Sequence, residues 1–574
     1  MYTNNRLNLF RFVKPVLIFF VMTAVINILF VGLDNLIPQI VRIIVDQVIV
    51  GRNLENISIL LGSLLAIGLV RGFMGYAREY FCDHAGSRIG SNIRKDLFEK
   101  MQSLSANFYD KNNSGELMSR VMDDVNSIWE IFTFVGMLIM EVIIHVCVVI
   151  FCMFKMDWRL SVIPTAALLV CGFISIIMDR YVGPLFGSIF EENSKLNNTV
   201  QETLGGIRTV KSFLREKYEI SKFRRHNEKY FELNYRQSKM FAAFNPVFMI
   251  VRVLIPIIMI IQGGILAIRD QITLGTLTAF VQYSMNIAWP IDLIGWLTSC
   301  LARGIQGAKR IDRIYREIPQ IVDEGTSAFT ECSSIEFKNV TFLAENGSRI
   351  LEDVNFSIKS GQTLGIMGAT GSGKTSIVNL LKRMYDVSDG TILLDGKDIR
   401  SISLSELRRN ISIVSQDVFL FSESIDANIR LGEKAKLDSS QVDKSLDDAC
   451  ASQFVSRLEE GKNTVIGERG IGLSGGQKQR LTIARALSRT KAPVLVFDDS
   501  TSALDTETEK QIQHMLAEKT DVTKIIIAHR ISAVRNADLI IVMDKGKIAE
   551  CGSHDQLLKQ KGMYWQTWQI QSDL

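Results

Sequence analysis

The chain has 574 residues, of which 47% are hydrophobic and 22% charged, and its formal net charge is +4. This length exceeds what one hydrophobic core usually organises, so we expect at least two domains, and a single compact enzyme domain is disfavoured. The apolar composition excludes a disordered chain, and together with an ordinary share of charge it indicates one membrane part and one water-soluble part. The small net charge gives no support to nucleic-acid binding, and we expect none.

The first part of the chain contains six apolar runs of membrane-spanning length. They cover roughly residues 16–33, 57–70, 131–154, 160–178, 246–268 and 274–297. A helix needs about 20 apolar residues to cross a bilayer, and the second run is the least clear because Arg71 interrupts it. We therefore predict an integral membrane protein with six transmembrane helices.

Basic residues predict how these helices are oriented. Lysine and arginine precede the first run and crowd the long connection between the fourth and fifth runs. Because positive residues favour the cytoplasmic side, both termini and the two long connections are expected in the cytoplasm. These connections keep helical spacing apart from bends at 112–115 and 205–206, which are rich in Asn and Gly. We expect long helices that leave the bilayer and carry bends able to touch a cytoplasmic domain.

Four ionisable residues lie inside the apolar runs. They are Glu141, His145, Arg252 and Asp292. Such residues usually face protein or a water-filled cavity, so they are candidates for a substrate cavity. Glu141 and His145 are four residues apart and share a helix face, while Arg252 and Asp292 can pair with each other or with Glu141. A polar contact between helices explains them equally well.

A phosphate-binding motif follows the first apolar strand of the second part. The run 364–367 leads into GATGSGKT at 368–375, and an apolar helix follows. This GxxxxGKT pattern between a strand and a helix turns backbone amides toward a polyphosphate. We predict that Lys374 reaches the β- and γ-phosphates and that Thr375 holds Mg2+. The predicted nucleotide-binding residues are Gly368, Thr370, Gly371, Ser372, Gly373, Lys374 and Thr375.

Four polar residues stand directly after apolar strands. In chain order they are Gln416, Asp498, Asp499 and His529. Because the carboxyl ends of parallel strands meet at one sheet edge, Asp498 is expected beside the phosphate loop, where it supports Mg2+. Gln416 and His529 can sense the γ-phosphate or order an attacking water, and Gln416 is also a candidate Mg2+ ligand. Taken alone, Gln416 and His529 are more often structural, and a carboxylate such as Asp498 is as often an ordinary strand end as a functional group.

A second glycine-rich motif, LSGGQ at 473–477, opens a helix-like run. Serine and glycine at a helix start form an anion site, and the phosphate loop already supplies one cradle. We therefore predict that this motif serves the nucleotide of another subunit through Ser474, Gly475, Gly476 and Gln477. The alternative is an ordinary N-capped helix.

The order of these motifs resembles a half-transporter of the ABC family, with an exporter-type membrane domain fused to an ATPase domain. The resemblance rests on GATGSGKT (368–375), SQD (415–417), GERG (467–470), LSGGQKQR (473–480), VLVFDD (494–499), SALD (502–505) and AHR (528–530). More loosely, residues 108–125 and 202–213 look like the two intracellular coupling regions of the family.

The resemblance implies a fold and a cycle. The fold is an all-α polytopic membrane domain with six transmembrane helices at 1–320, a linker at 321–334 and an α/β P-loop ABC ATPase domain at 335–574. ATP and Mg2+ are the implied cofactors, and a second half-transporter is the implied partner. ATP is then sandwiched between the phosphate loop of one half and LSGGQ of the other, and nucleotide binding drives alternating access.

Two positions depart from the family pattern. The family usually has Glu after the Walker B Asp as the base that polarises water, whereas this chain has Asp499, which is one methylene shorter. The aromatic residue that normally stacks on adenine falls at Ala344, and the spacing favours neither Phe342 nor Phe337 as a substitute. Both departures affect the chain's own Walker site, while LSGGQ is intact. This resembles the slowly hydrolysing half of a heterodimeric multidrug exporter.

The expected function is ATP-driven export of hydrophobic or amphiphilic compounds. Drugs or lipid-like molecules are inferred as substrates from the resemblance, and the abundance of Met and Phe supports them weakly. The alternatives are a homodimeric lipid or drug flippase, and an ATP-gated channel or regulatory ABC protein. The compact layout favours a bacterial plasma membrane with the ATPase domain in the cytoplasm.

Overall fold

The computed structural model describes the chain apart from residues 1–5, 288, 326, 328–332, 434–436, 468–469, 471, 502 and 573–574. It also leaves aside the side chains of residues 179, 289, 291–292, 294–295 and 572. The chain forms two compact units. The first is Met1–Leu104 with Asn112–Ile318, and the second is Ser105–Lys111 with Pro319–Leu574. A short piece of the first predicted coupling region therefore belongs to the second unit.

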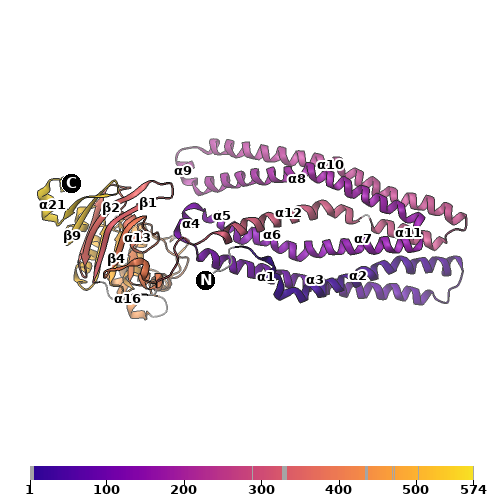
Figure 1. The fold of residues 1–574 in the computed structure, drawn as a ribbon, viewed down its shortest axis with the longest axis horizontal. Helices are drawn as coiled ribbons and strands as arrows, with labels where there is room; N and C mark the ends of the chain where they lie inside the picture. The colour runs from indigo at the N-terminus through magenta and orange to yellow at the C-terminus, as the bar shows by residue number, and fades with distance from the viewer. Residues whose placement is uncertain are drawn as a thin grey trace. The chain divides into compact units, whose positions relative to one another are not determined.

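The first unit consists of long helices that lie side by side (Figure 1). In chain order they are α1 (Leu9–Val13), α2 (Leu17–Ile43), α3 (Ile57–Gln102), α5 (Ser114–Ser119), α6 (Val125–Glu130), α7 (Gly136–Met156), α8 (Trp158–Gly205), α9 (Ile207–Ser212), α10 (Glu216–Ile268), α11 (Leu274–Asn286) and α12 (Trp289–Arg316). The 3-10 turn η1 (Lys14–Val16) and the π-helical turns η2 (Ile44–Val50), η3 (Arg120–Asp124) and η4 (Ile131–Val135) continue these helices.

Five helical stretches among the described residues are long and apolar enough to cross a membrane. They are Leu9–Val50, Ile57–Gln102, Ser114–Met156, Trp158–Gly205 and Glu216–Ile268. Each is much longer than the roughly 20 residues that a bilayer requires, so a large part of each helix extends beyond it. The sixth predicted run, 274–297, falls on α11 and the start of α12 and includes residues outside the described set.

The predicted bends are found at the helix ends. Asn113 caps α5 by accepting a hydrogen bond from the amide of Gly115 at 2.9 Å. Gly206 separates α8 from α9, and its amide donates to the carbonyl of Glu202 at 2.9 Å. Small polar residues and glycine thus end the helices where the sequence pattern predicts, because they satisfy or relax the terminal backbone groups.

The second unit contains two sheets. An antiparallel sheet has the order β2-β1-β4-β5, and a six-stranded sheet has the order β10-β9-β3-β8-β7-β6. In the second sheet, β10 pairs antiparallel with β9, while the other pairs are parallel. The strands are β1 (Ser334–Leu343), β2 (Arg349–Lys359), β3 (Thr363–Gly368), β4 (Asp389–Leu394), β5 (Lys397–Asp398), β6 (Ile411–Val414), β7 (Val494–Asp498), β8 (Thr523–Ile527), β9 (Leu539–Asp544) and β10 (Lys547–Gly552).

The second unit also contains helices, several of which pack on the parallel sheet. In chain order they are α4 (Ala106–Lys111), α13 (Lys374–Leu381), α14 (Leu404–Arg409), α15 (Ile425–Arg430), α16 (Ser439–Asp448), α17 (Ser452–Val455), α18 (Gly475–Leu487), α19 (Thr506–Glu518), α20 (Ile531–Val534), α21 (His554–Gln560) and α22 (Met563–Ser572). Strand β7 is buried along its whole length, which explains its continuous apolar sequence. The order β9-β3-β8-β7-β6 places the ends of β3, β8 and β7 next to one another.

Candidate functional site

The phosphate loop follows β3 and ends at the first residue of α13. Gly368, Gly371 and Gly373 have positive φ values of 146°, 81° and 97°. At Gly368 a Cβ atom would lie 2.3 Å from the carbonyl oxygen of Met543, so only glycine fits. These conformations turn the loop around the start of α13, where backbone amides favour an anion.

Lys374 and Thr375 supply the polar groups at this helix start. The Nζ of Lys374 donates to the carbonyls of Gly368 and Ala369, both at 2.9 Å. The Oγ1 of Thr375 donates to Oδ1 of Asp498 at 3.3 Å. Burial lowers the pKa of Lys374, while Asp499 and Asp498 oppose this shift. The ammonium group is therefore held within the loop by carbonyl oxygens that a phosphate can replace.

The residues fit a Mg-nucleotide. The Oγ of Ser372 is buried without a hydrogen-bond partner, which suits a phosphate oxygen. Burial raises the pKa of Asp498, the Thr375 hydrogen bond lowers it, and the charge of Asp499 raises it. A divalent cation would relieve this cost. Among the described residues no group of three His, Cys, Asp or Glu side chains could hold a metal alone, so Mg2+ would depend on phosphate oxygens as well.

One cavity of about 230 Å³ is lined by most of the side chains that the sequence predicts for the nucleotide site. Its lining residues are Ile350, Thr370, Gly371, Gly373, Lys374, Thr375, Ser376, Gln416, Asp498, Asp499, Ile527 and His529. The side chains predicted to bind phosphate, hold Mg2+ and orient water thus lie together, although they come from four separate strand ends. Sequence reasoning did not name Ile350, Ser376 or Ile527, which carry no distinctive motif of their own.

Asp499 has an unusual backbone conformation. Its φ is 44°, in the left-handed region, and its amide donates to the carbonyl of Ile527 at 2.9 Å. Aspartate adopts this region more readily than most residues with a side chain. The short side chain at this position therefore matches the turn that follows β7, in addition to changing the reach of the carboxylate.

The hairpin between β1 and β2 carries Ala344, the position at which the family pattern has the aromatic residue that stacks on adenine. The amide of Ala344 donates to the carbonyl of Ser348, and its carbonyl accepts from the amide of Gly347, both at 2.8 Å. Phe337 is buried and stacked on Phe356, with ring centroids 4.4 Å apart. Phe342 packs against Tyr385 at 5.7 Å. Among the described residues, no Phe, Tyr or Trp lines the nucleotide cavity.

The LSGGQ motif forms a capping box at the start of α18. The amide of Ser474 donates to Oε1 of Gln477 at 2.8 Å, and Ser474 Oγ accepts from the amide of Gln477 at 3.3 Å. Gly475 and Gly476 occupy the first turn between them. None of these four residues lines the nucleotide cavity. Of the related motifs, Glu468 and Arg469 of GERG and Ser502 of SALD lie outside the described residues.

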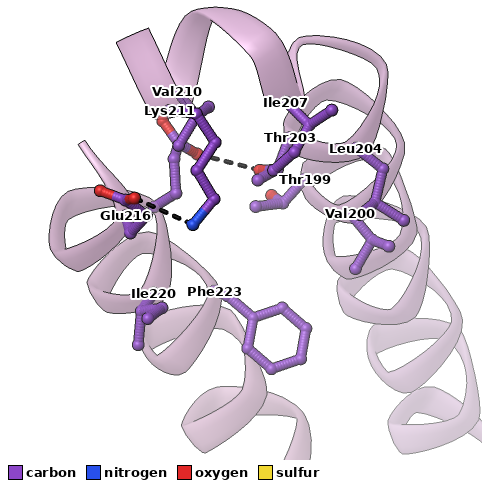
Figure 2. Close-up of a pocket in the computed structure, with 11 residues that line it drawn as sticks. Thr199, Val200, Thr203, Leu204, Ile207, Val210, Lys211, Glu216, Ile220 and Phe223 are labelled. Atoms are coloured by element: carbon purple, nitrogen blue, oxygen red, sulfur yellow. Dashed lines mark hydrogen bonds and ion pairs between the residues drawn. The ribbon is translucent and has the colours of Figure 1, made fainter. Parts of the chain in front are cut away.

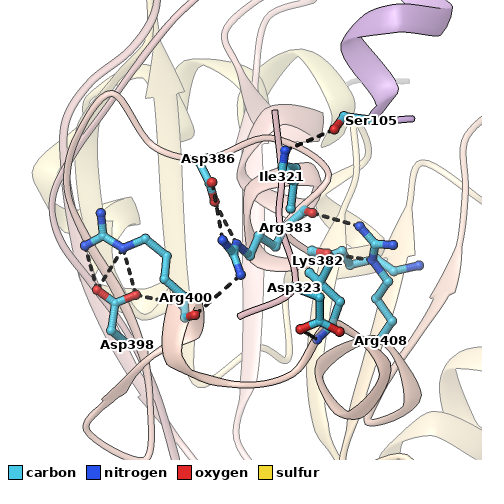
Figure 3. Close-up of polar contacts among 10 residues, drawn as sticks. Ser105, Ile321, Asp323, Lys382, Arg383, Asp386, Asp398, Arg400 and Arg408 are labelled. Carbon is cyan, nitrogen blue, oxygen red and sulfur yellow. Dashed lines mark hydrogen bonds and ion pairs between the residues drawn. The ribbon is translucent and has the colours of Figure 1, made fainter. Parts of the chain in front are cut away.

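The segment 105–111 packs within the second unit. The hydroxyl of Tyr385 donates to Asp110 at 2.7 Å, and the ammonium of Lys111 lies 2.6 Å from the carboxylate of Glu345. Figure 3 shows the neighbouring junction, where the amide of Ile321 donates to Ser105 Oγ at 3.0 Å. Burial and then the Asp110 contact raise the pKa of Tyr385 to about 12, so this phenol stays a donor.

The second predicted coupling region forms an apolar hollow. Residues at the ends of α8 and α10 and on α9 surround a cavity of about 300 Å³. Its apolar lining is made by Val200, Leu204, Ile207, Val210, Ile220 and Phe223 (Figure 2). An ion pair of 3.0 Å between Lys211 and Glu216 lies at its rim. Phe213 and Leu214, directly after α9, are exposed.

The ionisable residues of α7 belong to a charged cluster formed with α2 and α3. Arg78 lies 2.8 Å from Glu141 and donates to Oδ1 of Asn27 at 2.9 Å. Arg71 lies 2.6 Å from Asp34, and His145 Nδ1 is 4.0 Å from the same carboxylate. We call these residues the charged cluster: Asn27, Asp34, Arg71, Arg78, Glu141 and His145.

This cluster corrects one expectation about pairing. Glu141 has Arg78 as its ion-pair partner, and sequence reasoning had considered only Arg252 and Asp292 for that role. Arg252 is exposed on α10, and the side chain of Asp292 lies outside the described set. The sequence feature that could have revealed this pairing is the seven-residue spacing of Arg71 and Arg78, which places two cations on one face of α3. Both guanidinium groups also lie over the ring of Phe30, at 4.7 and 4.1 Å.

Comparisons with known proteins agree with this geometry. Residues 16–291 match the family "ABC transporter transmembrane region" and residues 351–502 the family "ABC transporter". A relative described as ATP-dependent lipid A-core flippase, from Syntrophus aciditrophicus, is 33% identical over 99% of this chain and 95% of its own length. The chain belongs to the ABC transporter family. The expected fold class, a helical membrane domain followed by an ABC ATPase domain, is confirmed.

A further relative and a solved structure are also similar to this ABC transporter over nearly its whole length. The uncharacterized ABC transporter ATP-binding protein YknU of Bacillus subtilis is 32% identical over 96% of this chain and 95% of that protein. A solved structure of a bacterial Atm1-family ABC exporter with ATP bound has a TM-score of 0.85, with 26% identity over 96% of this chain and 99% of that one. This ABC transporter is thus an integral membrane protein of the exporter type, with an ATPase domain that binds and hydrolyses ATP.

Proposed function

We propose that this chain is the slowly hydrolysing half of a heterodimeric exporter of hydrophobic or amphiphilic compounds. The observation that carries the proposal is Asp499, which lines the nucleotide cavity directly after Asp498, where the family pattern has the Glu that acts as the base. Its carboxylate is one methylene shorter than that of Glu, and misplacements of about 1 Å can cost on the order of a hundredfold in rate. Ala344, which offers no ring to a base, supports the same interpretation.

Each residue of the site has a proposed role. Bound Mg2+ would neutralise phosphate charge, and Thr375, Gln416 and Asp498 would hold it. Lys374 would exchange its two loop carbonyls for phosphate oxygens, and the loop amides would bind the rest of the polyphosphate. Asp499 would act as a weak base toward water. His529 would contact the γ-phosphate.

The partner subunit is proposed to complete both nucleotide sites. LSGGQ does not line this chain's own nucleotide cavity, and Ser474 and Gly475 at the start of α18 are exposed to solvent. Both observations support the use of this motif on the nucleotide of the partner. We propose that the partner carries Glu after its Walker B Asp. The exposed Phe213 and Leu214 and the apolar hollow beside them offer a surface for the partner's ATPase domain, so closure of the two ATPase domains would move α8 and α10.

The charged cluster is the proposed polar part of the substrate cavity, with Glu141 and His145 contributed by α7. Charges inside a membrane domain are costly and commonly mark a substrate path. Donors in the cluster are incompletely used, because the Nε atoms of Arg71 and Arg78 and the Nδ2 of Asn27 are buried without partners. Arg252 and Asp292 remain proposed contributors. The apolar remainder of the helices suits amphiphilic molecules.

Purification of the full-length chain in lipid nanodiscs tests the proposal. We expect nucleotide binding, little hydrolysis by the chain alone, and recovery of a different half-transporter when the chain is isolated from its native bacterial plasma membrane. Vigorous ATPase activity coupled to lipid or drug movement by the chain alone would instead establish a homodimeric flippase, the alternative favoured by relatives that are named flippases. Accumulation of substrate in vesicles against a gradient would exclude a simple channel.

A further inference from the structure

The last helix of the described chain, α22, is anchored beside the strand that leads to His529. The carboxylate of Glu550 accepts hydrogen bonds from the amides of Met563 and, at 3.1 Å, of Tyr564. Tyr564 is buried in an apolar cluster that includes Ile531, and its hydroxyl lies 2.7 Å from Nδ1 of His554. Both the start and the buried face of α22 are therefore fixed to the parallel-sheet subdomain.

At the other end of α22, Gln571 holds the backbone on both sides of residue 530. Its Oε1 accepts from the amide of Ile531 at 2.8 Å, and its Nε2 donates to the carbonyl of His529 at 2.8 Å. A side-chain amide is suited to this task because it donates and accepts at once. A carboxylate of the same length could satisfy only the Ile531 amide.

These two backbone groups, the carbonyl of His529 and the amide of Ile531, lie just beyond the C-terminal end of β8. The amide of Ala528 still donates to Ile366 of β3, at 3.2 Å. Immediately afterwards, Arg530 takes an extended conformation as the N-cap of the four-residue helix α20 and makes no capping bond with its side chain. Gln571 thus supplies the cap that the short helix lacks, and it fixes the carbonyl of the residue whose side chain lines the nucleotide cavity.

We propose that Gln571 is a positioning residue for His529, so that recognition of the γ-phosphate depends on the docked C-terminal helix. The inference rests on the proposed function, in which His529 contacts the γ-phosphate. A His side chain in an exposed turn can adopt several rotamers. A hydrogen bond to the backbone carbonyl of the same residue restricts the backbone to which that side chain is attached. Without the amide, ADP contacts would persist while the γ-phosphate contact would weaken.

The test compares the affinities of a non-hydrolysable ATP analogue and of ADP, both with Mg2+, for the full-length chain in nanodiscs. For Gln571→Ala we expect an unchanged ADP affinity and an analogue affinity weaker by about fivefold, which corresponds to about 1 kcal/mol for one uncharged contact. Gln571→Glu should weaken analogue binding at least as much. Gln571→Asn keeps an amide on a shorter side chain, and it serves as the second variant if Gln571→Ala does not fold. Gln566→Ala, on the same helix, is the matched control and should change neither affinity.

A double substitution separates positioning from a structural role. When His529 is replaced by Ala, the further change Gln571→Ala should cause no additional loss of analogue affinity. An additive loss, or an equal loss of ADP affinity, would overturn the proposal because it would show that α22 merely stabilises the fold. If His529→Ala alone leaves the preference for the analogue over ADP intact, the proposed role of His529 fails instead, and that result is distinguishable from the others.

Discussion

Replacing Asp499 with Glu should accelerate ATP hydrolysis by this chain. The added methylene advances the carboxylate by roughly 1.5 Å, a displacement on a scale that can change rates by about a hundredfold. The left-handed φ of 44° works against the change, because ordinary side chains lose about 1–2 kcal/mol there and Asp loses less. We expect a gain in kcat of roughly ten- to hundredfold, at a cost below about 1 kcal/mol in stability.

The assay is phosphate release by the full-length chain in nanodiscs, with nucleotide affinity measured in parallel. Asp499→Asn is the matched control, since it keeps the short side chain and its tolerance of the left-handed region but removes the charge. It should not exceed the wild-type rate. If Asp499→Glu binds ATP normally, remains folded and still hydrolyses no faster than wild type, the reach of this carboxylate does not limit the rate.

Three further outcomes are expected. Ala344→Tyr should tighten ATP about fivefold through stacking while leaving tripolyphosphate binding unchanged, whereas Ala344→Leu should give no comparable gain in equilibrium titrations. Lys382, whose pKa is lowered to about 8 by burial and by Arg489 and Arg408, is unfavourable when protonated. The unfolded state keeps that proton up to a higher pH. At pH 7, Lys382→Met should therefore increase the free energy of unfolding by at most about 3 kcal/mol, which is measured as a higher melting temperature. The advantage should shrink as the pH rises from 8 toward 10.5, and an advantage that is constant with pH would refute the cause. In thermal unfolding, Arg78→Met should destabilise the chain by about 3 kcal/mol by leaving Glu141 unpaired, and adding Glu141→Gln should recover part of that loss.

The nucleotide cavity could be predicted from the sequence because each of its parts is encoded in a contiguous stretch. The glycines that set the loop conformation stand next to Lys374, and a polar residue after a buried strand reaches the sheet edge whatever the rest of the chain does. Gln416 and His529 could be placed there for the same reason. The lining residue Ile350 could not, because its position depends on how the β1–β2 hairpin packs against the phosphate loop.

The contacts of the charged cluster and of Gln571 depend on long-range packing. Arg78 lies in a helix whose polar residues mostly belong to its part beyond the bilayer, so nothing local marks it as the partner of Glu141. Gln571 is 42 positions from His529 and sits on an exposed helix face, where glutamine is ordinary. A single sequence shows which residues carry chemistry, whereas the pairing of distant elements is decided by the fold.

The membership of residues 105–111 in the second unit has a consequence for biogenesis. This segment leaves the ribosome more than two hundred residues before the Pro319–Leu574 segment that surrounds it. During that interval Asp110 and Lys111 have no Tyr385 or Glu345 to contact, although the helices on either side can already insert. Residues 105–111 therefore reach their native contacts only after the Pro319–Leu574 segment has been synthesised and folded, so the folding of the second unit cannot be completed by its own C-terminal segment alone.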